Sequence, residues 1–355
     1  PKNVIDSIYN FLTNIGGNPG RSNHDNGLQS NRLLLEARET LASFFNFNKI
    51  ENVIFTNNIT TSLNILINGC LRNGDHIITS SMEHNSVLRP LINLKNLGVI
   101  ELDIINADPF GFINIDDFKN AIKPNTKYII ITQASNVTGS IQPIKKIGEL
   151  CRDNNIHFIL DTAQGAGVLD LDFNELNLSA LAFTGHKSLF GPQGIGGFII
   201  SDELNEICKP YMFGGTGSLS HSLMQPEFLP DKFESGTLNM PGIIGLMEGV
   251  KFIESQGLKT IYEKNKFLRT WRYLIMKATG IVRPVDPLGR VVIPVELRRS
   301  LNIKTDDALE VYVDGDYIML KKYEPACIFC GDAKDVVNVK GKKVCKACLQ
   351  EMKNL

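Results

Sequence analysis

The chain has 355 residues, of which 43% are hydrophobic and 21% are charged, and its formal net charge is −1. This length and composition are those of a globular protein with enough apolar material for a sizeable core, and they predict two or three domains. A net charge near zero excludes a global attraction to nucleic acid or to a membrane surface, so any such partner would have to bind a local patch.

Membrane insertion and a disulfide framework are also disfavoured by the sequence. No apolar run approaches the roughly 20 residues that span a bilayer, and the N-terminus lacks a signal-peptide layout. The cysteines fall into a scattered set, Cys70, Cys151 and Cys208, and a C-terminal cluster, Cys327, Cys330, Cys345 and Cys348. This uneven usage favours reduced thiols together with a metal site, and therefore predicts a cytoplasmic protein.

Short β-rich apolar runs alternate with helical patterns between about residues 30 and 200. Helices are expected between several of these runs, for example over 60–72 and 143–155. Strands that are buried on both faces and joined by helical crossovers predict an α/β domain with a mainly parallel sheet. In such sheets, ligands bind at the carboxyl ends of the strands. The expected strands are 52–56, 76–80, 99–104, 127–133, 157–161, 180–185 and 196–200.

The strand expected at 180–185 runs into Thr184-Gly185-His186-Lys187 and then into a glycine-rich loop. A lysine in this position is either an ordinary exposed residue, which is the commoner case, or a reactive amine. The carboxyl end of a strand is a binding position in this type of sheet, which favours the amine. Reactive lysines most often form imines, and pyridoxal phosphate is the cofactor that uses one.

Pyridoxal phosphate needs a buried carboxylate for its ring nitrogen, polar donors at a helix N-terminus for its phosphate, and a flat group against its ring. Asp161 closes a predicted strand, Thr60 and Thr61 open a predicted helix, and His84 follows another strand. Each has an ordinary alternative role, as a helix cap or as a structural histidine. Because separate strand ends of one sheet supply all the required groups, the set predicts a pyridoxal phosphate site.

Five segments, in order along the chain, carry a family resemblance. Residues 1–268 resemble class V, fold-type I pyridoxal-phosphate enzymes, closest to the cysteine desulfurases and the related selenocysteine lyases. The resemblance implies a PLP-transferase-like large domain and cysteine or a related amino acid as substrate. The segments are "SMEHNSVLRP", "QASNVTGSIQPI", "LDTAQGAG", "TGHKSLFGPQGIGG" and "FESGTLNMPGIIGL".

The resemblance also implies residue roles. Lys187 would form the imine with the cofactor aldehyde, and His84 would stack on the ring. Thr237 is similar to a residue that reaches the cofactor of the partner subunit, so a homodimer is implied. The other implied roles are ring-nitrogen contact for Asp161, ring-hydroxyl contact for Gln164, ring or substrate contact for Asn136, and phosphate contact for Thr60, Thr184 and His186.

The sequence departs from this family at both ends. Family members begin with a short strand bearing an Asn-Ala-Ala-Thr-type motif, and this sequence starts just after that position. They end with a small α/β domain that supplies an arginine for the substrate carboxylate and, in desulfurases, the sulfur-accepting cysteine. Here the resemblance stops near Leu268, and Cys70, Cys151 and Cys208 match no acceptor position. We therefore expect cofactor binding with weak or absent desulfuration.

Residues 276–324 resemble the AbrB/SpoVT family of bacterial transition-state regulators through "ATGIVRPVDPLGRVVIPVELRRSLNI". Members form swapped-hairpin β-barrel dimers that bind DNA, so residues 276–355 are expected to bind duplex DNA. Basic side chains suit contacts with phosphates and guanine edges, although a solvated charged helix is the alternative for "ELRR". The candidate DNA-binding residues are Lys277, Arg283, Arg290, Arg298 and Arg299.

The tail, residues 325–355, contains two Cys-x2-Cys pairs separated by fourteen residues. Four thiolates at this spacing predict a tetrahedral Zn²⁺ site at Cys327, Cys330, Cys345 and Cys348, with a redox dithiol pair or an iron–sulfur cluster as alternatives. A hairpin is expected between the pairs, followed by a final helix.

The predicted organisation is a large domain over 1–268, a junction over 269–275, an AbrB-like domain over 276–324 and a zinc tail over 325–355. One functional hypothesis is an impaired desulfurase-like enzyme joined to a DNA-binding regulator. The alternatives are a regulator whose large domain is a cofactor sensor or relic, or an erroneous joining of two genes.

Overall fold

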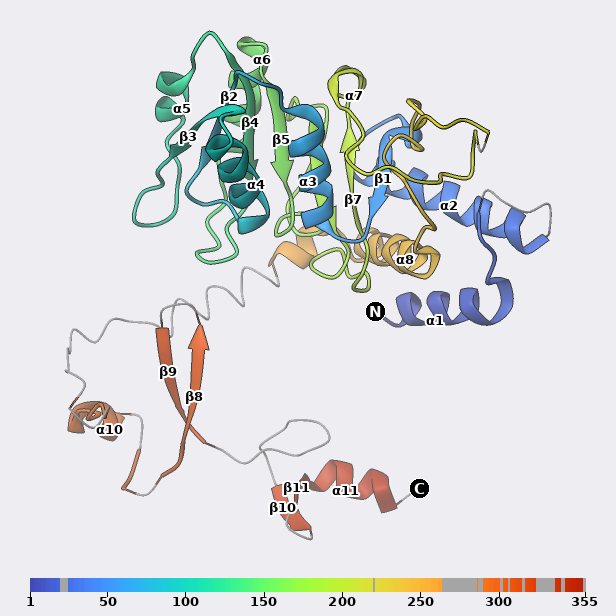
Figure 1. The fold of residues 1–355 in the computed structure, drawn as a ribbon. Coiled ribbons are helices and arrows are strands. Elements are labelled where there is room, and N and C mark those ends of the chain that lie inside the picture. The colour runs from blue at the N-terminus through green and yellow to red at the C-terminus, as the bar shows by residue number, and fades with distance from the viewer. Residues whose placement is uncertain are drawn as a thin grey trace. The chain divides into compact units, whose positions relative to one another are not determined.

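The computed structural model describes residues 1–19, 25–219, 221–263, 286, 290–300, 303–305, 307–314, 317–323, 336–339 and 342–353. The chain divides into two compact units, Pro1–Ile275 and Met276–Leu355 (Figure 1). Within the described ranges, no helix is both long enough and apolar enough to cross a membrane.

The strands of the first unit are β1 (Val53–Thr56), β2 (Asp75–Ser80), β3 (Ile100–Ile105), β4 (Thr126–Thr132), β5 (His157–Asp161), β6 (Ala180–Thr184) and β7 (Gly196–Ile200). In the described part of this unit they form one sheet with the order β1-β7-β6-β5-β4-β2-β3. The pairs from β3 to β6 are parallel, whereas β7 is antiparallel to both β6 and β1. The predicted α/β fold with a mainly parallel sheet is confirmed.

Helices cover both faces of the sheet. They are α1 (Lys2–Asn10), α2 (Asp25–Phe44), α3 (Ile59–Cys70), α4 (Asn85–Asn96), α5 (Ile115–Ala121), α6 (Ile144–Asp153), α7 (Asp202–Ile207) and α8 (Met240–Gln256), with a π-helical turn at Phe11–Ile15 and a 3₁₀ turn at Ile50–Asn52. Side chains from α2, α6 and α8 belong to one buried cluster, and those from α3 and α4 belong to another. In Figure 1, α3 and α4 lie on the viewer's side of the sheet.

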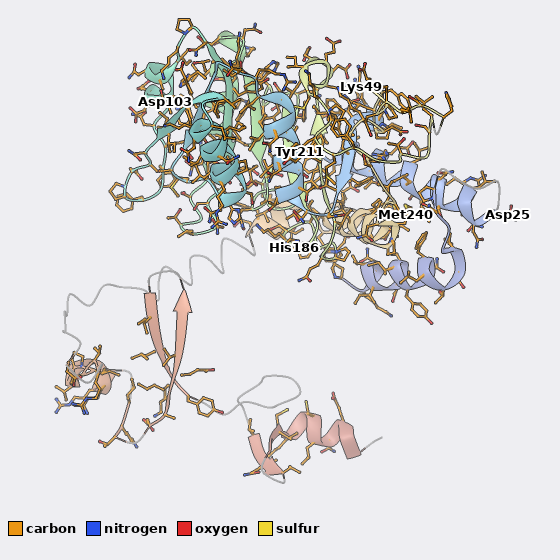
Figure 2. All side chains as sticks on the ribbon, viewed as in Figure 1. Asp25, Lys49, Asp103, His186, Tyr211 and Met240 are labelled. Carbon is orange, nitrogen blue, oxygen red and sulfur yellow. A yellow bond between two sulfur atoms is a disulfide. The ribbon has the colours of Figure 1, made fainter. Side chains whose placement is uncertain are left out.

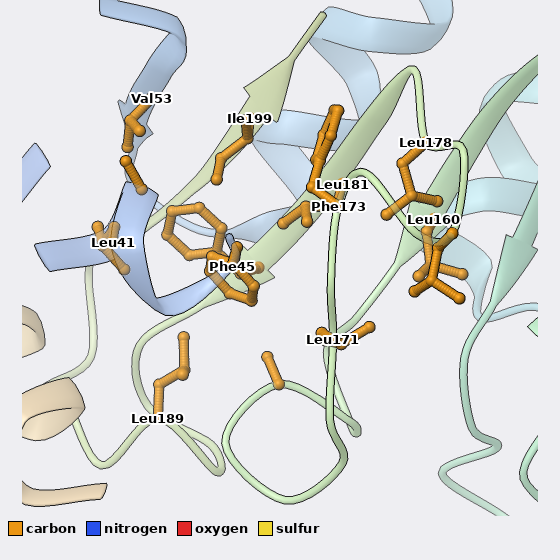
Figure 3. Close-up of a cluster of buried hydrophobic side chains, with 14 of the residues drawn as sticks. Leu41, Phe45, Val53, Leu160, Leu171, Phe173, Leu178, Leu181, Leu189 and Ile199 are labelled. Carbon is orange, nitrogen blue, oxygen red and sulfur yellow. The ribbon is translucent and has the colours of Figure 1, made fainter. Parts of the chain in front are cut away.

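The two buried clusters follow from the two-residue period of the strands. In β1, Val53 and Phe55 contribute to the cluster of α2, while Ile54 contributes to the cluster of α3. Figure 3 shows part of the first cluster, to which Leu41, Phe45 and Val53 all belong. Every residue of β6 and of β7 is buried, so both strands are covered on both faces.

Cys70 and Cys208 form a disulfide, so the expectation of reduced thiols in the scattered set is wrong for this pair. Cys70 ends α3, Cys208 follows α7, and both are buried. A Cβ at Gly69 would lie 2.6 Å from the carbonyl oxygen of Lys209, so glycine permits the close approach of the two segments. The cysteines are 138 residues apart, and only the folded chain brings them together.

The second unit contains α10 (Val295–Ser300), β8 (Leu309–Asp314), β9 (Tyr317–Lys322), β10 (Val336–Val339), β11 (Lys342–Cys345) and α11 (Lys346–Lys353). Strands β8 and β9 pair as an antiparallel hairpin, and so do β10 and β11. The β10–β11 hairpin and α11 match the hairpin and final helix predicted for the tail, although α11 begins earlier than expected.

Candidate active site

The carboxyl ends of the parallel strands meet at one edge of the sheet. His186, which follows β6, lies at this edge in Figure 2, whereas Lys49, which precedes β1, lies at the opposite edge. The sequence motifs that follow β2, β4, β5 and β6 are therefore collected on one side of the domain, as the strand pattern predicted.

Asp161 ends β5 and is buried, with a relative exposure of 2%. Its Oδ1 accepts a hydrogen bond of 2.8 Å from the backbone N–H of Ala163, which fixes the carboxyl group. Burial raises the pKa of Asp161, while the Ala163 hydrogen bond and the positive charges of Lys187 and His84 oppose that rise. The structure thus brings Lys187 and His84 within electrostatic reach of the buried carboxyl group.

The two ends of the loop that carries Lys187 are in contact with each other. The backbone N–H of Gly185 donates to the carbonyl oxygen of Ile195 at 2.9 Å. A Cβ at Gly185 would lie 2.7 Å from a methyl group of Ile195, so the turn requires glycine. At the start of the loop, the hydroxyl of Thr184 and Nδ1 of His186 are hydrogen-bonded at 3.1 Å. Lys187 itself is half-buried, immediately after this bonded pair.

Thr60 and His84 are joined through Ser86, a residue that the sequence reasoning missed. The hydroxyl of Ser86 is 2.9 Å from the hydroxyl of Thr60 and 2.7 Å from Nδ1 of His84. His84 also caps α4, because its Nδ1 accepts the backbone N–H of Ser86 at 3.1 Å. The sequence does contain a signal for Ser86, because it is a small polar residue in the first turn of the helix that follows His84.

The first turn of α3 is capped from within the chain. Asn58 accepts the backbone N–H of Thr61 at 3.0 Å, so that amide already has a partner. Thr61 also lines a cavity of about 70 Å³ together with Thr237 and Ser235. The structure therefore places Thr61, a predicted phosphate contact, and Thr237, predicted to reach the cofactor of a partner subunit, on the walls of one cavity.

Three further predicted residues lie in surface loops of the first unit. Asn136 is exposed in the loop after β4, Gln164 is half-buried just after β5, and Thr237 is exposed before α8. In the described part of the chain, none of these side chains forms a hydrogen bond with another predicted site residue.

Glu83 was also missed, although it directly precedes His84. It is buried, and its Oε1 accepts a hydrogen bond of 2.6 Å from the hydroxyl of Ser80. Burial raises the pKa of Glu83 to about 8, against hydrogen bonds from Ser80 and the Thr132 backbone, and the charge of Asp161 adds to the rise. Among the described residues, Glu83 Oε2 and Gln133 Oε1 are buried acceptors without a hydrogen-bond partner.

Several residues predicted in the second unit, Lys277, Arg283, Cys327 and Cys330, lie outside the described residues. Arg290 is exposed and forms an ion pair with Asp286 at 2.8 Å. Arg298 and Arg299 occupy the last turn of α10, where Arg299 is exposed and Nε of Arg298 is buried without a partner in the described part of the chain.

The described half of the cysteine cluster lies at the end of β11 and in α11. The backbone N–H of Cys348 donates to Sγ of Cys345 at 3.4 Å. Across the described ranges, which include only these two cysteines of the cluster, no three His, Cys, Asp or Glu side chains gather as a metal site.

The α/β fold with its mainly parallel sheet is that of a pyridoxal-phosphate transferase-like domain. The chain belongs to the aminotransferase class-V family, which matches residues 1–293. Residues 282–327 match a second family, antidote-toxin recognition MazE, a bacterial antitoxin. Both resemblances recognised in the sequence are confirmed, the second as a MazE/AbrB-like domain.

Known relatives agree with this assignment. A probable cysteine desulfurase of Borreliella burgdorferi is 32% identical over 280 residues, covering 76% of this chain and 66% of the relative. The apo structure of a cysteine desulfurase from Thermococcus onnurineus NA1 has a TM-score of 0.74 at 26% identity, covering 92% of this chain and 77% of that one. A structure described as SspA in complex with cysteine has a TM-score of 0.63 at 29% identity, covering 71% of this chain and 69% of that one.

The match to the relatives is partial. The chain spans about two thirds of the length of the curated relatives from Borreliella burgdorferi and Methanothermobacter thermautotrophicus, 66% in each case.

Proposed function

We propose that the first unit binds pyridoxal phosphate through Lys187 and acts on cysteine or a related amino acid. The observation that carries the proposal is the buried carboxyl group of Asp161, which has Lys187 and His84 within electrostatic reach. A carboxyl group in such a place is disfavoured as an anion unless a cation faces it. A protonated ring nitrogen would be such a cation, and it would complete a buried ion pair with Asp161.

The chemistry of the surrounding groups fits this cofactor. When bound, pyridoxal phosphate supplies an aldehyde that condenses with amines and a ring that stabilises negative charge on an attached carbon. Lys187 would supply the amine, and Asp161 would hold a proton on the ring nitrogen. The remaining proposed contacts are His84 on the ring face, Gln164 at the ring hydroxyl, Asn136 near the ring or substrate, and Thr60, Thr61, Thr184 and His186 at the phosphate. Thr237 would reach the phosphate of the partner subunit's cofactor.

We further propose that this chain alone transfers sulfur poorly. Rapid desulfuration needs an accessible thiolate to accept sulfur. Cys70 and Cys208 are joined as a disulfide, and both are buried. Cys151 is fully buried, and burial raises the pKa of its thiol. Thus none of the cysteines described in the first unit presents a reactive thiolate to solvent.

A visible absorption spectrum tests cofactor binding. The full chain mixed with pyridoxal phosphate should develop a yellow absorbance that Lys187→Ala abolishes. Lys146→Ala is the matched control, because Lys146 is an exposed lysine of α6 that was not predicted as a site residue. A spectrum that is identical in all three proteins would overturn the proposal.

For the second unit, we infer that residues 276–355 bind duplex DNA as a swapped-hairpin dimer with a zinc-stabilised tail over 325–355. The match of residues 282–327 to a MazE antitoxin family supports a regulatory module, and α10 places Arg298 and Arg299 in its last turn. In this account the domains are 1–268, 276–324 and 325–355. The segment 269–275 joins the first domain to the second. The rival account, in which the first unit is a cofactor sensor or relic, keeps the DNA-binding role and predicts cofactor binding without turnover.

A gel-shift series with the full chain tests DNA binding. Retardation should weaken with salt, with a slope of roughly −0.9 per phosphate contact in a plot of log affinity against log salt concentration. Arg299→Ala should weaken binding, whereas Arg152→Ala, a change of an exposed arginine in the first unit, should not. Absence of retardation at low salt would contradict the inference.

A further inference from the structure

A buried ion pair joins two distant parts of the first unit. Nη2 of Arg38, in α2, lies 2.6 Å from Oε2 of Glu234, and both side chains are only 6% exposed. Burial of two charges is unfavourable unless further hydrogen bonds satisfy them. The contacts of this pair with β1 provide those hydrogen bonds.

Arg38 and Glu234 together cover the free edge of β1. Among the strands that the structure describes, β1 is the last one of the sheet on this side, so its outward backbone groups pair with no other described strand. Oε1 of Glu234 accepts the backbone N–H of Phe55 at 2.7 Å. Arg38 donates to the carbonyl oxygen of Val53, and its guanidinium lies 5.0 Å from the centre of the Phe55 ring. The carboxylate of Glu234 therefore has one fixed position against β1.

Glu234 opens the loop 234–239, which is also held at its other end. Asn239 donates from Nδ2 to the carbonyl oxygen of Gly194 at 2.8 Å and accepts the backbone N–H of Gly242 at 3.1 Å. Gly194 belongs to the loop that follows Lys187. Between the two anchors, Ser235 and Thr237 face the cavity that Thr61 of α3 also lines.

We infer that Arg38 and Glu234 are positioning residues for cofactor binding, which set the loop 234–239 so that the Thr237 hydroxyl can bind the cofactor phosphate. The inference rests on the proposed function, because it assigns Thr237 to the phosphate. Glu234 lines the same cavity as Thr237, whereas Arg38 does not. Because the carboxylate of Glu234 is bonded to Arg38 and to the backbone of Phe55, the pair would act on the cofactor through the loop 234–239. The pair should therefore control recognition of the phosphate and leave recognition of the ring unchanged.

The test compares pyridoxal phosphate with pyridoxal, which lacks the phosphate, as ligands of the full chain. Wild-type protein should bind pyridoxal phosphate at least about tenfold more tightly, the change expected from a hydrogen bond to a charged group. Glu234→Gln keeps an acceptor for Phe55 but removes the charge that holds Arg38. It should abolish most of this preference while the affinity for pyridoxal stays the same. Arg38→Lys, a milder change, should reduce the preference in the same direction.

A double-mutant cycle separates positioning from general damage. Thr237→Val should reduce the preference by itself, and it should add nothing in the Glu234→Gln background, because the misplaced hydroxyl no longer contacts the phosphate. Asp202→Asn is the control, since Asp202 forms an exposed ion pair with Lys49 near the other end of β1. That variant should keep the full preference.

Two results would overturn the inference while leaving the proposed function intact. One is an undiminished preference for the phosphate in both Glu234→Gln and Arg38→Lys. The other is an equal loss of affinity for the two ligands, which indicates a scaffold role only. Binding of neither ligand by the wild-type protein would instead overturn the proposed function, and the inference with it.

Discussion

The hydroxyl groups of Thr60 and Ser86 are hydrogen-bonded at 2.9 Å, which joins the first turn of α3 to the first turn of α4. Ser86 is also bonded to Nδ1 of His84 at 2.7 Å. The residue proposed to stack on the cofactor ring is thus held by the helix that carries the proposed phosphate contacts. A substitution of Ser86 should therefore affect both the position of His84 and that of the phosphate contacts on α3.

Ser86→Ala removes the bridge between Thr60 and His84 without adding bulk. Each hydrogen bond contributes about 1 kcal/mol net, so the variant should bind pyridoxal phosphate roughly 5- to 30-fold more weakly. A fluorescence titration measures this, with Ser255→Ala, near the end of α8, as the control. Unchanged affinity in Ser86→Ala would show that the bridge does not position the site.

Glu83 predicts a pH dependence of stability. Its pKa in the folded chain is about 8, whereas an unfolded glutamate titrates near a pKa of about 4.3. Between these values the folded state holds one more proton than the unfolded state, so the free energy of unfolding falls as pH rises. Glu83→Gln cannot ionise and should therefore gain stability relative to wild type, by up to about 1.4 kcal/mol for each pH unit between roughly pH 5 and 8.

Urea unfolding at several pH values checks the Glu83 prediction, with Glu206→Gln as a control at an exposed position. A stability difference between wild type and Glu83→Gln that stays constant over this pH range would show that Glu83 is ionised in the folded chain.

The sequence was most informative where local pattern decides the structure. The apolar runs 157–161 and 196–200 coincide with β5 and β7, because strands buried on both faces read as short continuous hydrophobic segments. The same pattern placed Asp161 and His186 at strand ends. Their collection at one edge then followed from parallel pairing.

Long-range contacts were beyond the reach of local pattern. The Cys70–Cys208 disulfide joins residues 138 apart, and the Arg38–Glu234 pair joins α2 to the loop before α8, 196 residues away. Glu83 reads as a surface residue by type, and only the folded chain shows its burial beside Ser80 and Asp161. Such partners are set by how strands and helices pack, which spacing along the chain does not encode.

Sulfide release from cysteine should be slow in the full chain. The buried Cys151 and the disulfide-linked Cys70 and Cys208 leave no accessible thiolate among the cysteines described in the first unit. Cys151→Ser should accordingly release sulfide at the wild-type rate in a colorimetric assay. Rapid release that disappears on changing one of these three cysteines would contradict this prediction.

The C-terminal cysteines should hold about one Zn²⁺ per chain, because four thiolates complete a closed tetrahedral site. Cys345 lies at the end of β11 and Cys348 in α11, three residues apart. Metal analysis of the full chain should show loss of zinc in Cys345→Ser and full zinc in Cys151→Ala, which changes the first unit. Equal zinc content in the two variants would assign the metal to other residues.

The identity of the lysine that binds the cofactor tests the central claim most directly. The buried carboxyl group of Asp161 is the group that we propose to contact the cofactor ring, and the positive charge of Lys187 lies within its electrostatic reach. Borohydride reduction of the full chain with pyridoxal phosphate, followed by peptide mapping, should place a single stable label on Lys187 and none in Lys187→Ala. A label on another lysine, or no label on the wild-type chain, would contradict the account.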